Sequence, residues 1–266
     1  MMLQSSVLAS DNGGFHAPSL ADFFPPAIFA EGTMFEFNRV TLVRLIAVAA
    51  LVLFFWLAAR RTQLVPGRMQ AVGEIAIDFV RKSIAVETLG EDRGRRYTPL
   101  LATIFFGVLF LNITGVIPFL NLAGSSVVGI PIVFAVIAYV AFIRAGIKER
   151  GPGHFFKDQL FPPGVPWPIY ILLTPLELFS TFILRPVTLT VRLLANMIAG
   201  HLLLVLCFGA THYLFLEAGG PLALFGVITG LGGLAFTLLE IFIASLQAYI
   251  FALLTAVYIQ LSVEAH

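Results

Sequence analysis

Residues 168–209 read PIYILLTPLELFSTFILRPVTLTVRLLANMIAGHLLLVLCFG, and this stretch decides the fold class. Apart from a few ionisable residues it is apolar throughout. A helix of this length measures roughly 60 Å, which is twice the hydrocarbon thickness of a bilayer. The stretch is therefore either two membrane spans, broken at Pro175 or Pro186, or one steeply tilted helix. Residues 221–261 pose the same question.

The rest of the chain has a similar composition. Of its 266 residues, 59% are hydrophobic and 12% are charged, about half the charged fraction of a soluble domain. Three shorter apolar stretches predict further spans, over about 40–59, 97–119 and 127–143. An amphipathic pattern over about 66–89 predicts a helix at the membrane surface. We expect an all-α integral membrane protein, with a single membrane domain over 38–266 and an N-terminal extracytoplasmic segment over 1–37.

Basic residues orient the spans. Eight of the 16 Lys and Arg residues fall between the first and second spans, and four follow the third. The positive-inside rule therefore places these two loops in the cytoplasm and the N-terminus outside. Counting each long stretch as one crossing gives about five transmembrane helices and a cytoplasmic C-terminus, which is the interpretation we favour. Splitting only one of the two long stretches would reverse the C-terminus.

Few ionisable residues interrupt the two long stretches. The Asp, Glu, Lys, Arg and His residues between Trp167 and Leu261 are Glu177, Arg185, Arg192, His201, His212, Glu217 and Glu240. Each charge within a bilayer is costly, so it needs either a structural partner or a hydrated ion path. Glu217, beside a Gly-Gly pair, and His212 are interpreted as loop residues. The others are candidates for an ion or proton path.

A polar stripe follows one face of the first long stretch. Steps of three and four residues return to the same side of a helix, and here they connect Thr181, Arg185, Thr188, Arg192 and Asn196. Arg185 precedes Pro186 and is compatible with either an interface position or a structural role. Arg192 lies among apolar residues and cannot release its proton, so it acts as a fixed positive charge.

Two further candidates lie away from this stripe. His201 is nine residues beyond Arg192, about half a turn off the stripe, and is either a structural histidine or a proton carrier. Glu240 and Gln247 are seven residues apart and share a face, with Tyr258 nearly in line. Small residues upstream, Gly226 and Gly230, favour close helix approach. Glu240 needs a partner, and His201 is the titratable candidate.

Several functional classes are disfavoured by the sequence. A formal net charge of +1 gives no reason to expect a nucleic-acid partner. The chain has one cysteine, Cys207, and none of the motifs GxxxxGK[ST], HExxH and GxSxG, so we expect no catalytic residues, cofactor or metal. An intramembrane enzyme is therefore disfavoured. A secondary ion-coupled transporter remains the alternative, although no convincing internal repeat accompanies the buried charges.

The two long stretches carry a recognisable signature. RPVTLTVRLLANMIAGH (185–201) and LEIFIASLQAYIFALLTAVYIQL (239–261) resemble subunit a of the F-type ATP synthases, the stator half of their proton channel. The resemblance covers roughly residue 97 to the C-terminus and is strongest from about residue 172. It implies a hairpin of two long, tilted helices, which agrees with five spans. It also implies that catalysis belongs to partner subunits.

The resemblance assigns roles to individual residues. Arg192 matches the family's essential arginine, which faces the rotating ring of c subunits and prevents a proton short-circuit. Asn196 and Gln247 match the asparagine and glutamine near that arginine. His201 and Glu240 occupy the two channel positions, in some members with acid and histidine exchanged. Proton translocation would then use Arg192, His201, Glu240, Asn196, Gln247 and Glu177, and the polar stripe would face the ring.

Two departures from the family pattern affect these assignments. The loop after the second span reads NLAGSSV without the family's acidic residue, so outer access would rely on Asn112, Asn121 or Ser126 and water. Glu177 is one residue out of the usual register relative to Arg192. The partners implied are the c-subunit ring, b-type peripheral stalk subunits, other ATP synthase subunits and lipid. The implied location is a bacterial plasma membrane, with an organellar inner membrane as the alternative.

Overall fold

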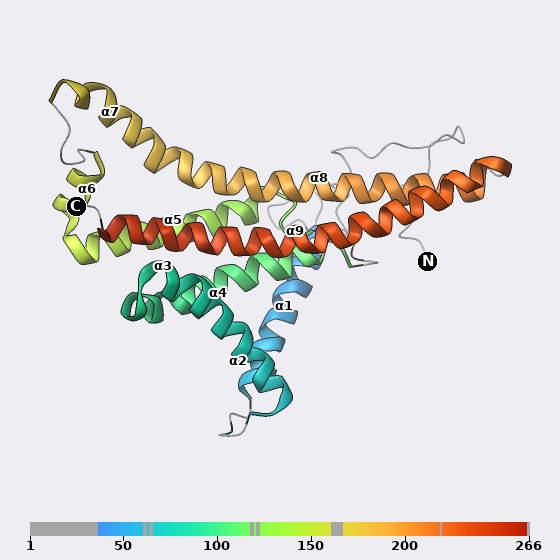
Figure 1. Ribbon diagram of the computed structural model, residues 1–266, viewed down its shortest axis with the longest axis horizontal. Helices are drawn as coiled ribbons and strands as arrows, with labels where there is room; N and C mark the ends of the chain where they lie inside the picture. The colour runs from blue at the N-terminus through green and yellow to red at the C-terminus, as the bar shows by residue number, and fades with distance from the viewer. Residues whose placement is uncertain are drawn as a thin grey trace.

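The computed structural model describes residues 37–60, 63, 66–117, 120, 123–160, 167–218 and 220–264. Every regular element among them is a helix (Figure 1). In chain order these are α1 (Arg39–Ala59), α2 (Arg68–Val80), η2 (Arg81–Val86), α3 (Glu87–Leu89), α4 (Glu91–Ile113), α5 (Gly129–Arg150), α6 (Pro152–Leu160), α7 (Trp167–Phe179), η3 (Ser180–Leu184), α8 (Arg185–Tyr213), η4 (Leu214–Ala218), η5 (Gly220–Leu222) and α9 (Ala223–Glu264).

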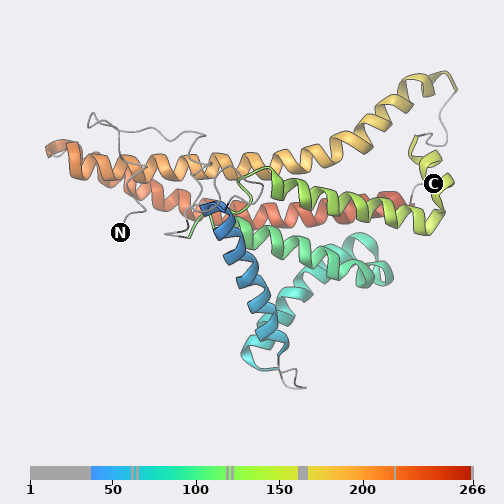
Figure 2. The ribbon, with the colours of Figure 1, turned by 180° about the vertical axis from the view of Figure 1, so that it is seen from behind.

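Five helices in the described ranges are long and apolar enough to cross a membrane, as the sequence predicts. Two of them are very long: Leu172–Glu217 has 46 residues and Gly220–Val263 has 44. They lie side by side along the longest axis of the molecule, with α1 crossing them at a steep angle (Figures 1 and 2). The prediction of two long helices in a hairpin is confirmed.

Neither proline divides the first of these long helices. Pro175 lies inside α7, and Pro186 is the second residue of α8, directly after the π-helical turn that precedes it. The wider π-helical turn η3 joins α7 to α8, and Figure 1 shows one continuous, bent helix. The alternative of two separate spans is therefore wrong.

Close packing at the turn of the hairpin uses small residues. A Cβ at Gly226 would lie 3.1 Å from the Phe215 ring, and one at Gly230 would lie 3.4 Å from Thr211. The hydroxyls of Thr211 and Thr229 meet at 2.9 Å across the two helices. Gly226 and Gly230 therefore allow the close approach that their spacing predicts.

The middle and C-terminal part of α9 forms the centre of the bundle. Its residues Phe251, Ala252 and Ile259 are fully buried in an apolar cluster with α4, α5 and α8. At the end of α9, Arg150 of α5 donates from its Nε and one terminal nitrogen to the carbonyl of Val263, at 3.0 and 2.9 Å. Because α9 is packed against α4 and α5 as well as α8, it forms the support on which α8 lies.

Some helix limits differ from those expected from apolarity alone. The second span begins at Glu91 rather than near residue 97, because Gly90 adopts a positive φ of 79° and acidic residues in the first turn stabilise a helix N-terminus. The third begins at Gly129 and extends to Arg150, with basic residues in its last turn. The amphipathic pattern over 66–89 becomes the continuous helical run from α2 to α3.

Candidate functional site in the α8 and α9 hairpin

A hydrogen bond joins the centres of α8 and α9. The amide of Asn196 donates to Oε1 of Gln247 at 2.9 Å. Gln247 is 2% exposed, and its own amide nitrogen is buried without a hydrogen-bond partner in the described part of the chain. These two residues, 51 positions apart, thus form a polar contact in the otherwise apolar interface between α8 and α9.

Arg192 lies one turn before Asn196, near the midpoint of the 46-residue stretch Leu172–Glu217. Its side chain is exposed on the outer face of α8, beside exposed Val191. Within the described ranges, Arg192 makes no hydrogen bond or ion pair. A charge at the centre of a bilayer costs about 2.5–3.5 kcal/mol even on insertion scales, so this guanidinium requires either an anionic partner or a hydrated environment.

The expected outward stripe does not extend along the whole of α8. Thr188 and Arg192 are exposed and Asn196 is partly buried, but Thr181 is 0% exposed. The Arg185 guanidinium points inward, 5.6 Å from the Phe142 ring centroid and 5.1 Å from that of Tyr258. Thr181 does not share the exposed face, because the π turn over Ser180–Leu184 changes the helical register before α8. Arg185 keeps the register of Thr188 and Arg192 within α8, but its guanidinium turns inward onto the two aromatic rings. The expected outward position is therefore wrong for Thr181 and for the Arg185 guanidinium.

Glu240 and His201 are both buried, at 7% and 6% exposure. The Glu240 carboxylate lies directly against Gly200, the neighbour of His201: a Cβ on Gly200 would overlap the carboxylate carbon and both oxygens. In the described residues, Glu240 has no hydrogen bond or ion pair, and its carboxylate meets α8 at Gly200, the residue before His201. Gly200 was not among the residues that the sequence pattern singled out, although it adjoins His201.

Glu177 lies at the other end of the long helix, in α7, and is partly buried. Its negative charge lies within electrostatic range of Arg185, whose guanidinium stacks on the ring of Tyr258. Sequence spacing identified the two charges but not the aromatic rings around Arg185, which come from α5 and α9.

The segment after α4 forms a second polar group. Ser125 donates to Oδ1 of Asn112 at 2.5 Å, and both side chains are 0% exposed. Arg44 of α1 donates from Nε to the carbonyl of Gly124 at 2.9 Å, a role that the sequence did not reveal. Asn112 Nδ2 and Ser126 Oγ are buried without a hydrogen-bond partner in the described ranges. Asn121 lies outside the described residues.

An apolar contact connects the segment after α4 to the part of α8 around His201. Val40 at the start of α1 is buried against Val127 and against Ile198 and Leu202 of α8. Each side of this apolar contact adjoins a polar residue in the sequence: Ser126 precedes Val127, and His201 precedes Leu202. At the turn of the hairpin, His212 and Glu217 are exposed, as loop residues would be, but both lie in helices, α8 and η4. Among the described residues, no three His, Cys, Asp or Glu side chains converge as metal ligands would.

These features define a class: a multi-pass α-helical membrane protein whose long hairpin carries an outward-facing fixed charge and buried ionisable groups. A family model of the ATP synthase A chain matches residues 41–260. ATP synthase subunit a of Rhodococcus erythropolis is 49% identical over 263 residues, covering 99% of this chain and 95% of that protein. The same subunit of Pseudarthrobacter chlorophenolicus is 40% identical, covering 99% of each chain. That of Streptomyces lividans is 37% identical, covering 96% and 90%.

The chain belongs to the ATP synthase subunit a family. It is a proton-translocating, non-catalytic subunit of the membrane sector of an F-type ATP synthase, and a multi-pass plasma-membrane protein. Membership in this family excludes the alternative of a secondary ion-coupled transporter, which the buried charges alone had left open.

Proposed function

We propose that this subunit forms two offset aqueous half-channels that load and unload carboxylates on a rotating ring of c subunits, with Arg192 between them. The observation that carries the proposal is the position of Arg192: exposed, halfway along the long helix and without an ionic partner in the described chain. An anionic group on a neighbouring subunit would complete the pair that such a charge requires.

The outer half-channel is built around Glu240 and His201. Their burial in the hairpin separates them from the exposed face of α8, so a proton could reach them without first meeting Arg192. Asn112 and Ser126 offer buried polar atoms that lack a described partner, and such atoms are the usual ligands of internal water. Water held there would connect the outer surface to the His201 region and replace the acidic residue that the family often has in this loop.

The inner half-channel starts from Glu177. Its charge and that of Arg185 lie toward the end of the long helix that is opposite to the hairpin turn. A proton released from the ring after nearly a full rotation would leave along this side. The two half-channels would thus be displaced along the long helix, and a proton could pass between them only on the ring.

Arg192 acts as the barrier between the two half-channels. Its guanidinium stays charged at any physiological pH, so it attracts a deprotonated ring carboxylate and repels a free proton. In a site of low dielectric constant, such an interaction is worth several kcal/mol. The ring carboxylate that faces Arg192 is therefore ionised. The positive charge of Arg192 also opposes direct passage of protons from one half-channel to the other.

The charged helix ends support an orientation for the chain. The start of α4 and the end of α5 meet through Arg96 and Glu149, 3.9 Å apart, and the end of α9 joins them through Arg150. The start of α1 lies at the other side, where Arg39 donates to the carbonyl of Leu120. With the basic end inside, the N-terminus is outside and the C-terminus is cytoplasmic. Exposed apolar faces of α1 and α5 leave room for b-type stalk subunits.

Cysteine cross-linking in assembled complexes tests which face meets the ring. Thr188→Cys is exposed one turn before Arg192, and Leu193→Cys is buried beside it. Each is paired with a cysteine introduced near the proton-carrying carboxylate of the c subunit. We expect an oxidative cross-link from position 188 and none from position 193. If neither position forms a cross-link in normally assembled complexes, the exposed face of α8 does not meet the ring.

A further inference from the structure

A cavity of about 690 Å³ lies between α1, α2, η2 and α4, away from the proposed proton path. This volume is typical of a small-molecule site. Its lining has an apolar part and a cationic end, formed by Leu51, Phe55, Ile77, Arg81, Arg95, Thr98, Pro99, Ala102, Thr103 and Phe106.

The lining is about as long as one leaflet is deep. Along α4 the lining runs from Arg95 to Phe106, about 16 Å at 1.5 Å per residue, and half of a bilayer's hydrocarbon core is about 15 Å. At the deep end, the rings of Phe55 and Phe106 meet edge to face with centroids 5.0 Å apart. A groove for a neighbouring transmembrane helix would continue through the other leaflet, whereas an acyl chain ends at mid-bilayer.

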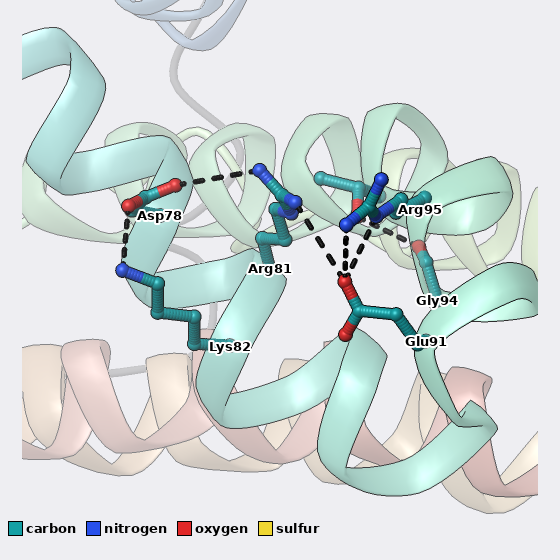
Figure 3. A network of polar contacts seen from close by, with 7 residues as sticks. Asp78, Arg81, Lys82, Glu91, Gly94 and Arg95 are labelled. Carbon is teal, nitrogen blue, oxygen red and sulfur yellow. Dashed lines mark hydrogen bonds and ion pairs between the residues drawn. The ribbon is translucent and has the colours of Figure 1, made fainter.

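Five charged residues are in contact at the cationic end (Figure 3), and together they carry one excess positive charge. Glu91 is shared by two guanidiniums, Arg95 at 2.6 Å and Arg81 at 4.0 Å. Asp78 is bound by Lys82 at 2.8 Å, with Arg81 at 3.9 Å. The hydrogen bond and charge of Lys82 hold the pKa of Asp78 below its usual range, so this carboxyl is ionised at neutral pH. Three cations therefore face two carboxylates, and a single anionic group would balance them.

A hydrogen-bond acceptor lies at the same end. Pro99 has no N–H, so the carbonyl of Arg95, four residues earlier, lacks its usual helical donor. The nearby hydroxyls of Thr98 and Thr103 donate to other carbonyls, those of Gly94 and Pro99, at 2.7 and 2.8 Å. A ligand hydroxyl at this level would find both a cationic pair and an open carbonyl.

We propose that this cavity binds an anionic glycerophospholipid with a hydroxyl-bearing headgroup, of the phosphatidylglycerol type. Its phosphate contacts the guanidiniums of Arg81 and Arg95 beside the Glu91 carboxylate that they share, a headgroup hydroxyl donates to the Arg95 carbonyl, and an acyl chain fills the apolar part as far as Phe106. The site goes beyond proton translocation, and it joins α1 and the amphipathic run α2–η2 to α4 through a bound lipid.

Lipid analysis of the intact complex tests the site. The whole ATP synthase is purified in mild detergent with the double substitution Arg81→Gln and Arg95→Gln, and bound phospholipids are measured by native mass spectrometry. Arg68→Gln is the matched control, since Arg68 is an exposed arginine of α2 that does not line the cavity. We expect roughly a tenfold loss of bound phosphatidylglycerol in the double variant and none in the control, since charge-assisted hydrogen bonds are lost. Equal lipid in all three would overturn the proposal.

A second measurement identifies the occupant directly. A photoreactive benzoylphenylalanine at Thr103, exposed on the wall of the cavity, is irradiated in native membranes. We expect a phospholipid adduct on this chain, detected by its mass, and its reduction by Ala102→Phe, which fills the cavity but keeps both arginines. An adduct with another ATP synthase subunit in place of lipid would show that a protein occupies the site and would overturn the proposal.

Discussion

At the scale of single residues, Gly200 leaves the space that the Glu240 carboxylate occupies. In Gly200→Ala the new Cβ would overlap this carboxylate and displace it. We expect the initial rate of ATP-driven proton pumping in inverted vesicles to fall roughly tenfold or more at equal complex content, because small misplacements of a reacting group are costly. Gly232→Ala is the control, since nothing lies within 4 Å of its added Cβ. Equal pumping by the two variants would show that the position of Glu240 is unimportant.

The bond between Asn196 and Gln247 makes a separate prediction about stability. Asn196→Ala leaves the Gln247 amide, which is 2% exposed, with one more unpaired polar group. We expect a loss of about 1–3 kcal/mol. Replacing both residues by leucine should cost less than the sum of the two single leucine substitutions. The midpoint temperature for release of this subunit from the detergent-solubilised complex measures both effects, and strictly additive shifts would contradict a direct bond.

At the scale of elements, the end of α9 is held to α5. Arg150→Ala removes two hydrogen bonds to the Val263 carbonyl, so the last turn of α9 should open more often. We expect faster amide hydrogen exchange over residues 259–264 in Arg150→Ala, whereas Lys148→Ala, an exposed neighbour, should leave exchange unchanged. If both variants exchange as the native chain does, the hydrogen bonds from Arg150 to Val263 do not stabilise the end of α9.

The sequence predicted most of these elements because membrane helices follow from length and apolarity alone. It could not locate their ends, since Glu91 and Arg150 extend helices into charged segments that an apolar pattern excludes. It also could not detect the π turn at Ser180–Leu184, and for that reason Thr181 was assigned to the wrong face. The inward turn of the Arg185 guanidinium depends on aromatic rings of α5 and α9, which local spacing cannot show. Contacts between distant residues, such as Arg44 with Gly124, depend on tertiary packing that no local spacing encodes.

At the scale of the whole molecule, the arrangement separates two kinds of charge. Glu240 and His201 are enclosed by the hairpin, while Arg192 lies on its outside, near the midpoint of a 46-residue helical stretch. The start of α4 and the ends of α5 and α9 lie together at the end of the molecule opposite to the hairpin turn (Figure 1). The bundle of α4, α5 and α9 supports α8 from one side and leaves the face that carries Arg192 exposed.

The most direct test of this account is proton pumping by complexes that carry Arg192→Ala. ATP-driven pumping and passive proton leak are measured in inverted membrane vesicles with equal amounts of assembled complex. Thr188→Ala, on the same exposed face one turn earlier, is the control and should pump normally. We predict that Arg192→Ala abolishes coupled pumping, with ATP hydrolysis uncoupled or the vesicles leaky to protons. If Arg192→Ala complexes retain coupled pumping, Arg192 is not the barrier between the half-channels, and the proposed mechanism is wrong.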